Sequence, residues 1–165
     1  MVGNRRHATE AEASALASGI RLRIIRLTFA EALTNKELAQ RLGRDPATTL
    51  HHVRKLVDAG FLEPQPPRRG PRGAKEIPYL STGLSWQLDG AGRDAAEAML
   101  EAYLAEVAEV DVADLEQTRL VVQLADSDRA EFLGRLHELL DEFRRKPVTP
   151  GADRTAIYVA TYPSR

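Results

Sequence analysis

The part of this chain that most restricts its fold is residues 34–64, which carry closely spaced signals for helix starts and stops. Thr34 and Glu37 have the spacing of a capping box, in which each side chain accepts a hydrogen bond from the other residue's backbone N–H. Gly43 then suits a helix end, because a residue without Cβ takes the left-handed conformation at no steric cost. Pro46 suits the first position of a second helix, directly behind an aspartate that can cap it. The sequence therefore predicts two short helices that are joined by a tight turn and cross steeply.

The second of these helices, predicted over residues 46–59, has one apolar side. Because successive helical residues are 100° apart, Leu50, Val53 and Val57 fall on that side, with Leu56 at its margin. The side chains left facing outward are Thr48, His51, His52 and Lys55. Hydroxyl, imidazole and ammonium groups bind base edges and phosphates, so this face predicts contact with DNA. For this helix alone, a merely solvated face is the alternative.

A cationic, proline-rich segment follows the second helix at residues 64–78. Four prolines lie between Glu63 and Pro71, and prolines exclude a helix and confine a strand to a sheet edge. The cations of the segment are Arg68, Arg69, Arg72 and Lys75. We expect a hairpin whose basic tip lies along phosphates or enters the minor groove. The alternative is a flexible basic linker between domains.

Taken together, residues from about 16 to 82 resemble the winged helix-turn-helix domain of ArsR-like bacterial transcription regulators. The matching segments are ASGIRLRIIRLTF before the motif, TNKELAQRLGRDPATTLHHVRKLVDAGFLEP for the motif itself, and the basic hairpin as the wing. The chain departs from the pattern at Ser18 and Gly19, where many members have a His-Pro pair. The resemblance implies DNA contacts by Thr48, Thr49, His51 and Lys55 and by the wing cations. The full set of candidate DNA-binding residues is Lys36, Thr48, Thr49, His51, His52, Arg54, Lys55, Arg68, Arg69, Arg72 and Lys75.

Many members of that family sense metals, so the available ligands matter. The chain has no cysteine, which removes thiolate sites. Its four histidines are His7, His51, His52 and His137, and the adjacent pair points about 100° apart on a helix, a poor geometry for sharing one ion. We therefore predict no metal site and no cofactor, and keep a metal-responsive sensor as an alternative. No nucleophile elbow or phosphate-binding glycine loop is present, so we predict no catalytic residues and no enzyme.

Charge divides the chain into two unlike parts. Residues 1–90 hold 14 Lys or Arg and 9 Asp or Glu, for +5, whereas residues 91–165 hold 9 and 15, for −6. The first part suits a polyanion, and the second would be repelled by it. No apolar run approaches the roughly 20 residues of a membrane helix, and the N-terminus lacks the apolar core of a signal peptide. We expect a cytoplasmic protein that contacts no membrane.

The acidic part predicts a long helix over residues 84–110, followed by a strand, a helix and a second strand. The strands are expected in TRLVVQL and TAIYVATYP, on either side of the helical segment ADSDRAEFLGRLHELLDEFRRK. Two strands and one helix are too few to bury a sheet, so this unit must pack on the long helix or join the strands of another protomer. The expected fold is mainly α with small β (α+β), with a DNA-binding domain at residues 8–83 and a dimerisation region at 84–165.

These observations predict a homodimeric transcription regulator, expected to be a repressor, that binds double-stranded DNA. The long helix resembles the dimerisation helix of the family; a core helix within one protomer is the alternative. The C-terminal unit leaves room for a small-molecule effector. A winged-helix adaptor that binds protein without reading bases is the other function that the sequence leaves open.

Overall fold

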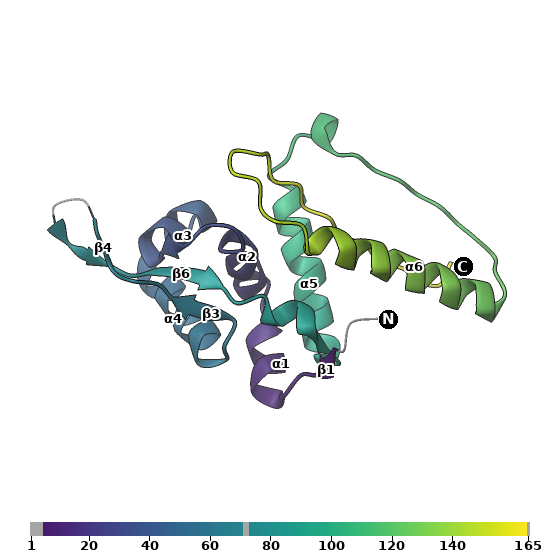
Figure 1. The fold of residues 1–165 in the computed structure, drawn as a ribbon, viewed down its shortest axis with the longest axis horizontal. Coiled ribbons are helices and arrows are strands. Elements are labelled where there is room, and N and C mark those ends of the chain that lie inside the picture. Colours follow the sequence, from purple (N-terminus) through teal and green to yellow (C-terminus); the bar gives the residue numbers. More distant parts are fainter. Residues whose placement is uncertain (1–4, 71–72, 165) are drawn as a thin grey trace. The chain divides into compact units, whose positions relative to one another are not determined.

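The computed structural model describes residues 5–70 and 73–164, which fall into two compact units, residues 5–108 and residues from 109 onward (Figure 1). The elements of the first unit are β1 (Arg6–His7), α1 (Glu10–Leu16), α2 (Gly19–Leu27), β2 (Leu33–Thr34), α3 (Asn35–Leu42), α4 (Pro46–Asp58), β3 (Leu62–Pro64), β4 (Arg68–Arg69), β5 (Lys75–Glu76), β6 (Pro78–Ser81), the 3-10 helix η2 (Leu84–Gln87), β7 (Leu88–Asp89) and α5 (Gly92–Val107). The second unit contains the 3-10 helix η3 (Val112–Asp114) and α6 (Asp126–Arg144).

The helix-turn-helix predicted from the sequence is present as α3 and α4. Thr34 and Glu37 form the expected capping box, and Gly43 ends α3 in the left-handed conformation with φ 60°. Asp45 accepts hydrogen bonds from the backbone N–H groups of residues 47 and 48, which fixes the start of α4. Local capping therefore determined both helices, as the sequence indicated.

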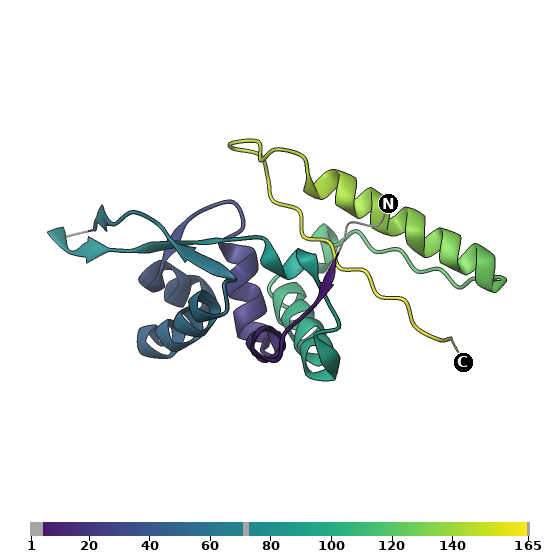
Figure 2. The same ribbon diagram turned by 60° about the horizontal axis from the view of Figure 1, so that its bottom comes forward.

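A hairpin follows α4 and extends well beyond the helices (Figures 1 and 2). Its base is β3 paired with β6, and β2 joins the other edge of β6 to complete a three-stranded antiparallel sheet. Further out, β4 and β5 pair with Arg68 opposite Glu76 and Arg69 opposite Lys75. Pro64, Pro66, Pro67 and Pro78 lie at the ends of the short strands or between them, where a missing N–H costs little. This confirms the expected hairpin and makes the domain a winged helix.

The core lies between α2, α3, α4 and the base of the hairpin. Its largest fully buried hydrophobic side chains are Ile24, Leu33, Leu38, Val53, Leu56 and Phe61. These residues come from α2, β2, α3, α4 and the position just before β3. Burying them together fixes the crossing of the helices and anchors the hairpin against α4.

The long helix is shorter than the predicted 84–110 and packs within its own protomer. Gly90 and Gly92 adopt positive φ, so the chain forms η2 and β7 before α5 begins. Buried Ala95, Ala98 and Ala102 let α5 approach α1 and α2 closely. Contacts thus place α5 with the helix-turn-helix and hairpin in the first unit, whereas the sequence-based division at 83 and 84 grouped it with the C-terminal region. That division stays a functional prediction.

In the second unit, the predicted helix is present as α6, but the predicted strands on either side of it are not. The segments TRLVVQL and TAIYVATYP carry no strand assignment in the part of the chain that the structure describes. A strand exists only when another strand completes its backbone hydrogen bonds, and sequence alternation does not supply that partner. The α+β class holds, with its strands confined to the first unit.

Among the described helices, none has the length and apolarity needed to cross a membrane.

Candidate nucleic-acid interface

The buried residues of α4 define which face of this helix points away from the core. Thr49, Val53 and Leu56 are buried, at 1%, 0% and 0% exposure, while Leu50 and Val57 are only half-buried. At 100° per residue, the buried side is therefore centred roughly 65° around the helix from the side of Leu50, Val53 and Val57 that the sequence indicated. Tertiary packing against α2 and α3 selected this side, because α4 offers two neighbouring apolar stripes.

This rotation corrects one candidate DNA contact. The resemblance placed Thr49 among the residues that touch DNA, but its side chain is in the core and its hydroxyl donates to the backbone oxygen of Asp45, 2.9 Å away. A buried hydroxyl already bonded to its own helix cannot reach a base edge. The expectation for Thr49 was wrong for this reason.

Three other candidates on α4 are solvent-exposed and share one side of the helix. They are Thr48, His51 and Arg54. Lys36, at the start of α3, is also exposed. Asn35 ties the two helix starts together, since its side-chain amide donates to the backbone oxygen of Pro46 at 2.9 Å. The exposed side of α4 is thus held at a fixed angle to α3.

His52 and Lys55 are half-buried, with His52 directed toward α2 and Lys55 toward α1. The Lys55 ammonium donates to the Ser14 hydroxyl at 3.0 Å, and His52 Nδ1 lies 3.5 Å from the Arg21 guanidinium. A guanidinium has no acceptor, so Nδ1 must accept, and the His52 proton belongs on Nε2. Burial lowers the pKa of His52, and the charge of Arg21 lowers it further. His52 is therefore a neutral imidazole whose remaining N–H is available as a donor.

Arg21 is the residue of this region that the sequence analysis missed. Its side chain is 8% exposed, and its guanidinium donates to the backbone oxygens of Ala15 at 2.5 Å, Ser14 at 2.8 Å and Ala17 at 3.3 Å. It thereby satisfies the last carbonyls of α1 while it faces α4. The available signal was an arginine next to isoleucine and leucine in the largely apolar run GIRLRII of α2, which also holds Arg23. Burial lowers the pKa of Arg21, although its charge persists because guanidinium remains protonated in proteins.

In the wing, the predicted cations differ in what surrounds them. Arg69 and Lys75 are exposed and stand opposite each other on β4 and β5. Arg68 forms an ion pair with Glu37 of α3, with both carboxylate oxygens within 2.6 Å of the same guanidinium nitrogen. The expectation for Arg72 falls outside the described residues.

Glu37 therefore has two roles, as helix cap and as partner of the wing. Partial burial raises the pKa of Glu37, but hydrogen bonds from the Thr34 N–H and hydroxyl, together with the Arg68 charge, outweigh it and hold that pKa below its usual range. The carboxylate is charged at neutral pH and holds Arg68 against α3. Any phosphate that Arg68 binds has to displace this carboxylate.

Within the residues that the structure describes, no group of three or more His, Asp or Glu side chains gathers closely enough to hold a metal ion. The two neighbouring histidines, His51 and His52, have ring centroids 5.9 Å apart and interplanar angle 66°.

Comparison with protein families gives a match over residues 16–65, to a model described as a helix-turn-helix domain. That span runs from the end of α1 to just beyond β3 and includes both α3 and α4. The chain contains a helix-turn-helix domain. The sheet and hairpin around it give this domain the form of a winged helix.

No curated protein matches the chain. The solved structures that match include the crystal structure of the transcriptional regulator SlyA, with 13% identity, 76% of each chain covered and a TM-score of 0.33. At that level of similarity the match carries no argument about what this chain binds.

Proposed function

We propose that this protein is a transcription regulator that binds double-stranded DNA sequence-specifically, as a homodimer of the ArsR-like type. The observation that carries the proposal is the exposed side of α4, where Thr48, His51 and Arg54 point away from a well-packed core. A helix held this way suits the major groove, in which such side chains read base edges. We infer a binding protein rather than an enzyme, acting in the cytoplasm, where bacterial DNA is located.

The wing supplies the second part of the proposed interface. Arg69 and Lys75 are exposed in the outer part of the hairpin, and neighbouring Arg68 pairs with Glu37 of α3. Cations in such a hairpin suit the phosphate backbone or a narrow minor groove next to the groove that α4 enters. The charge division of +5 over residues 1–90 against −6 over residues 91–165 supports approach to DNA from the wing side.

Dimerisation through α5 is supported by the two unlike sides of that helix. Its small side chains, Ala95, Ala98 and Ala102, face α1 and α2, whereas Met99, Leu100 and Leu104 are about half-exposed. A row of large apolar side chains on a protomer surface suits a second copy of the same helix. We infer that residues 8–83 read DNA and that the dimer contact begins in the region from residue 84 onward.

A dimer of this kind sets the expected geometry of the site. Two copies of α4 entering successive major grooves on one side of the duplex would lie about 34–36 Å apart and favour a pseudo-palindrome. Repression is the simplest outcome, because a dimer seated on a promoter excludes other proteins from the same grooves.

The test is a titration of the full chain, by fluorescence anisotropy, with labelled duplexes from the region upstream of its gene and with scrambled duplexes. We expect affinity for one upstream duplex that exceeds the scrambled control and falls steeply with salt, since bound phosphates release counterions. His51→Ala should reduce the preference for that duplex, while His137→Ala, an exposed histidine on α6, should not. No measurable affinity for any upstream duplex at low salt would refute the proposal.

A further inference from the structure

The C-terminal unit contains many large apolar side chains but buries none of them. No residue between 109 and 164 is buried, and α6 contributes none to a core. Ten of its large apolar side chains are between 42% and 73% exposed: Leu120, Val121, Val122, Leu124, Phe132, Leu139, Phe143, Ile157, Val159 and Tyr162. A chain segment that leaves such surface in water lacks the core that would hold it folded.

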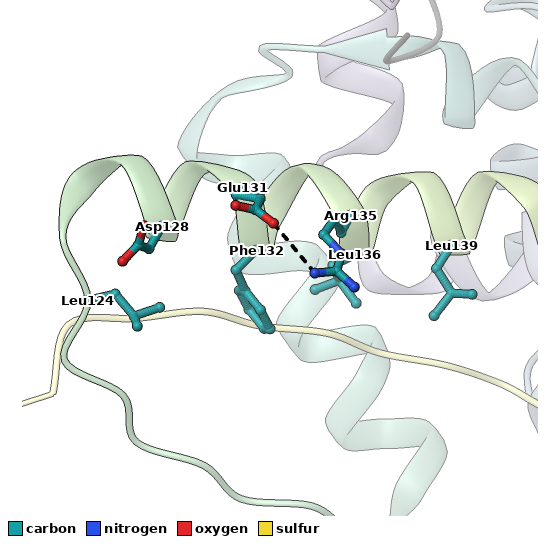
Figure 3. Close-up of a pocket in the computed structure, with 7 residues that line it drawn as sticks. All are labelled: Leu124, Asp128, Glu131, Phe132, Arg135, Leu136 and Leu139. Atoms are coloured by element: carbon teal, nitrogen blue, oxygen red, sulfur yellow. Dashed lines mark hydrogen bonds and ion pairs between the residues drawn. The ribbon is translucent and has the colours of Figure 1, made fainter.

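Large apolar side chains of α6 line up in a single stripe. Phe132, Leu136, Leu139 and Phe143 recur at spacings of four, three and four residues, which aligns them along one side of the helix. Figure 3 shows Phe132, Leu136 and Leu139 of this stripe with Leu124 beside them. Together with Asp128, Glu131 and Arg135, they line a hollow of about 620 Å³. One side of α6 can thus pack against an apolar surface.

The two extended segments beside α6 carry the matching pattern of a sheet with one apolar face. In residues 118–124, Leu120, Val122 and Leu124 alternate with Arg119, Val121 and Gln123. In residues 155–162, Ile157 and Val159 fall on one face. Neither segment belongs to a sheet in the described structure. Both segments have the composition of strands, but two strands are too few to form a stable sheet.

We propose that the C-terminal units of two copies of this chain combine into one four-stranded sheet, with both α6 helices covering its apolar face. Each copy supplies two strands, residues 118–124 and 155–162. Two strands and one helix make too small a sheet to be stable, whereas four strands and two helices make an ordinary two-layer domain. The occupant of the apolar side of α6 is therefore the sheet that two copies build.

The exposed area is sufficient for such a contact. Eight of these side chains lie on the α6 stripe or on the apolar faces of the two segments, and at roughly 100 Å² each they offer on the order of 800 Å² per copy. A specific interface of standard size buries about 800 Å² per partner. The C-terminal unit alone can thus supply a full interface, separate from the one proposed for α5.

Charge also permits two copies to pair at this segment. Residues 118–124 carry one charge, Arg119, and residues 155–162 carry none. If two copies of residues 118–124 pair antiparallel about Val121, Arg119 lies opposite Gln123 and Leu120 lies opposite Val122. No like charges meet, and Leu120, Val122 and Leu124 remain on one face, with Val121 on the other.

A cysteine crosslink tests this pairing directly, because the chain has no cysteine of its own. Val121→Cys places a single thiol at the symmetry centre, and Val148→Cys is the control, an exposed valine outside both segments. In a paired sheet the partner thiol has an effective concentration in the millimolar range. At about 10 µM full chain, mild oxidation should therefore yield covalent dimer roughly 100-fold faster for Val121→Cys than for Val148→Cys.

Hydrogen exchange on the wild-type chain provides the second readout. Amides of residues 118–124 and 155–162 should be protected at high protein concentration and lose protection on dilution, and Val122→Lys should abolish that protection. Equal crosslinking rates for the two cysteine variants would overturn the proposal. So would protection that persists at a monomeric mass, which would indicate folding within one chain, or protection that requires an added ligand or another protein. No DNA is present in these measurements, so their failure is distinct from a failure of the proposed DNA binding.

Discussion

The ion pair between Arg68 and Glu37 predicts that removing the Glu37 carboxylate strengthens DNA binding. Arg68 is a proposed phosphate contact, yet in the free protein both oxygens of Glu37 occupy its guanidinium. The conservative change is Glu37→Gln, since glutamine also completes a capping box with Thr34 and so preserves the start of α3.

The expected gain follows from the exposure of the pair. The side chains of Arg68 and Glu37 are 46% and 39% exposed, which makes this a surface ion pair worth about 0.2–1 kcal/mol. At about 1.4 kcal/mol per tenfold change, releasing Arg68 should raise affinity about 1.5- to 5-fold. The gain should be similar for specific and random duplexes, because phosphate contacts carry no sequence information.

The assay is the anisotropy titration of the full chain at several salt concentrations. Glu31→Gln is the matched control, because it removes the same charge from another exposed ion pair, with Arg41, that lies outside the wing. Arg68→Ala should lower affinity, and the double variant with Glu37→Gln should show no gain over Arg68→Ala alone. If Glu37→Gln binds no better than Glu31→Gln, or its gain survives in the double variant, Arg68 is not the group that the carboxylate restrains.

Four further predictions follow from individual contacts. Arg69→Ala should weaken binding to all duplexes and reduce the salt slope by about 1, whereas Arg129→Ala on α6 should leave the slope unchanged. Thr49→Val should change the free energy of unfolding by no more than about 1.5 kcal/mol in urea titrations, and it should leave base preference intact, because the Thr49 hydroxyl bonds within the protein. A change in base preference would contradict its buried position. Arg21→Met should lower the free energy of unfolding by about 2–5 kcal/mol, since several carbonyls of α1 lose a charged donor, and a loss below 1 kcal/mol would show that water replaces it. The hydrogen bond from Arg6 lowers the pKa of Glu12 to about 2. The stability from this charge is therefore present above the ordinary carboxyl pKa and is lost as pH falls toward 2. Glu12→Gln should flatten that part of the stability profile, measured by thermal unfolding between about pH 2 and 6.

The helix-turn-helix and the wing were predictable because their signals are local. The pair Thr34 and Glu37 and the left-handed Gly43 act within a few residues of themselves, so the sequence alone indicates where α3 starts and ends. The cations of the hairpin were also evident from the sequence, since proline excludes a helix wherever the segment lies.

The interface within the domain depended on contacts between distant residues. Two stripes of α4 were apolar enough to be buried, and packing against α2 and α3 chose the one that contains Thr49. The partners of Arg68, His52 and Lys55 come from α3, α2 and α1, at separations of 31 to 41 residues. No spacing rule reaches that far.

The sequence by itself determined the helices α3, α4 and α6, the turn between α3 and α4 and which end of the chain is cationic, because capping, backbone conformation and charge are local properties. Only the tertiary structure decided which side chains of α4 remain exposed and which contact Arg21 or Ser14, and that Glu37 pairs with Arg68 of the wing. It also showed that alternation at residues 118–124 and 155–162 is not enough to form strands, because a strand requires hydrogen-bond partners that its own sequence cannot provide.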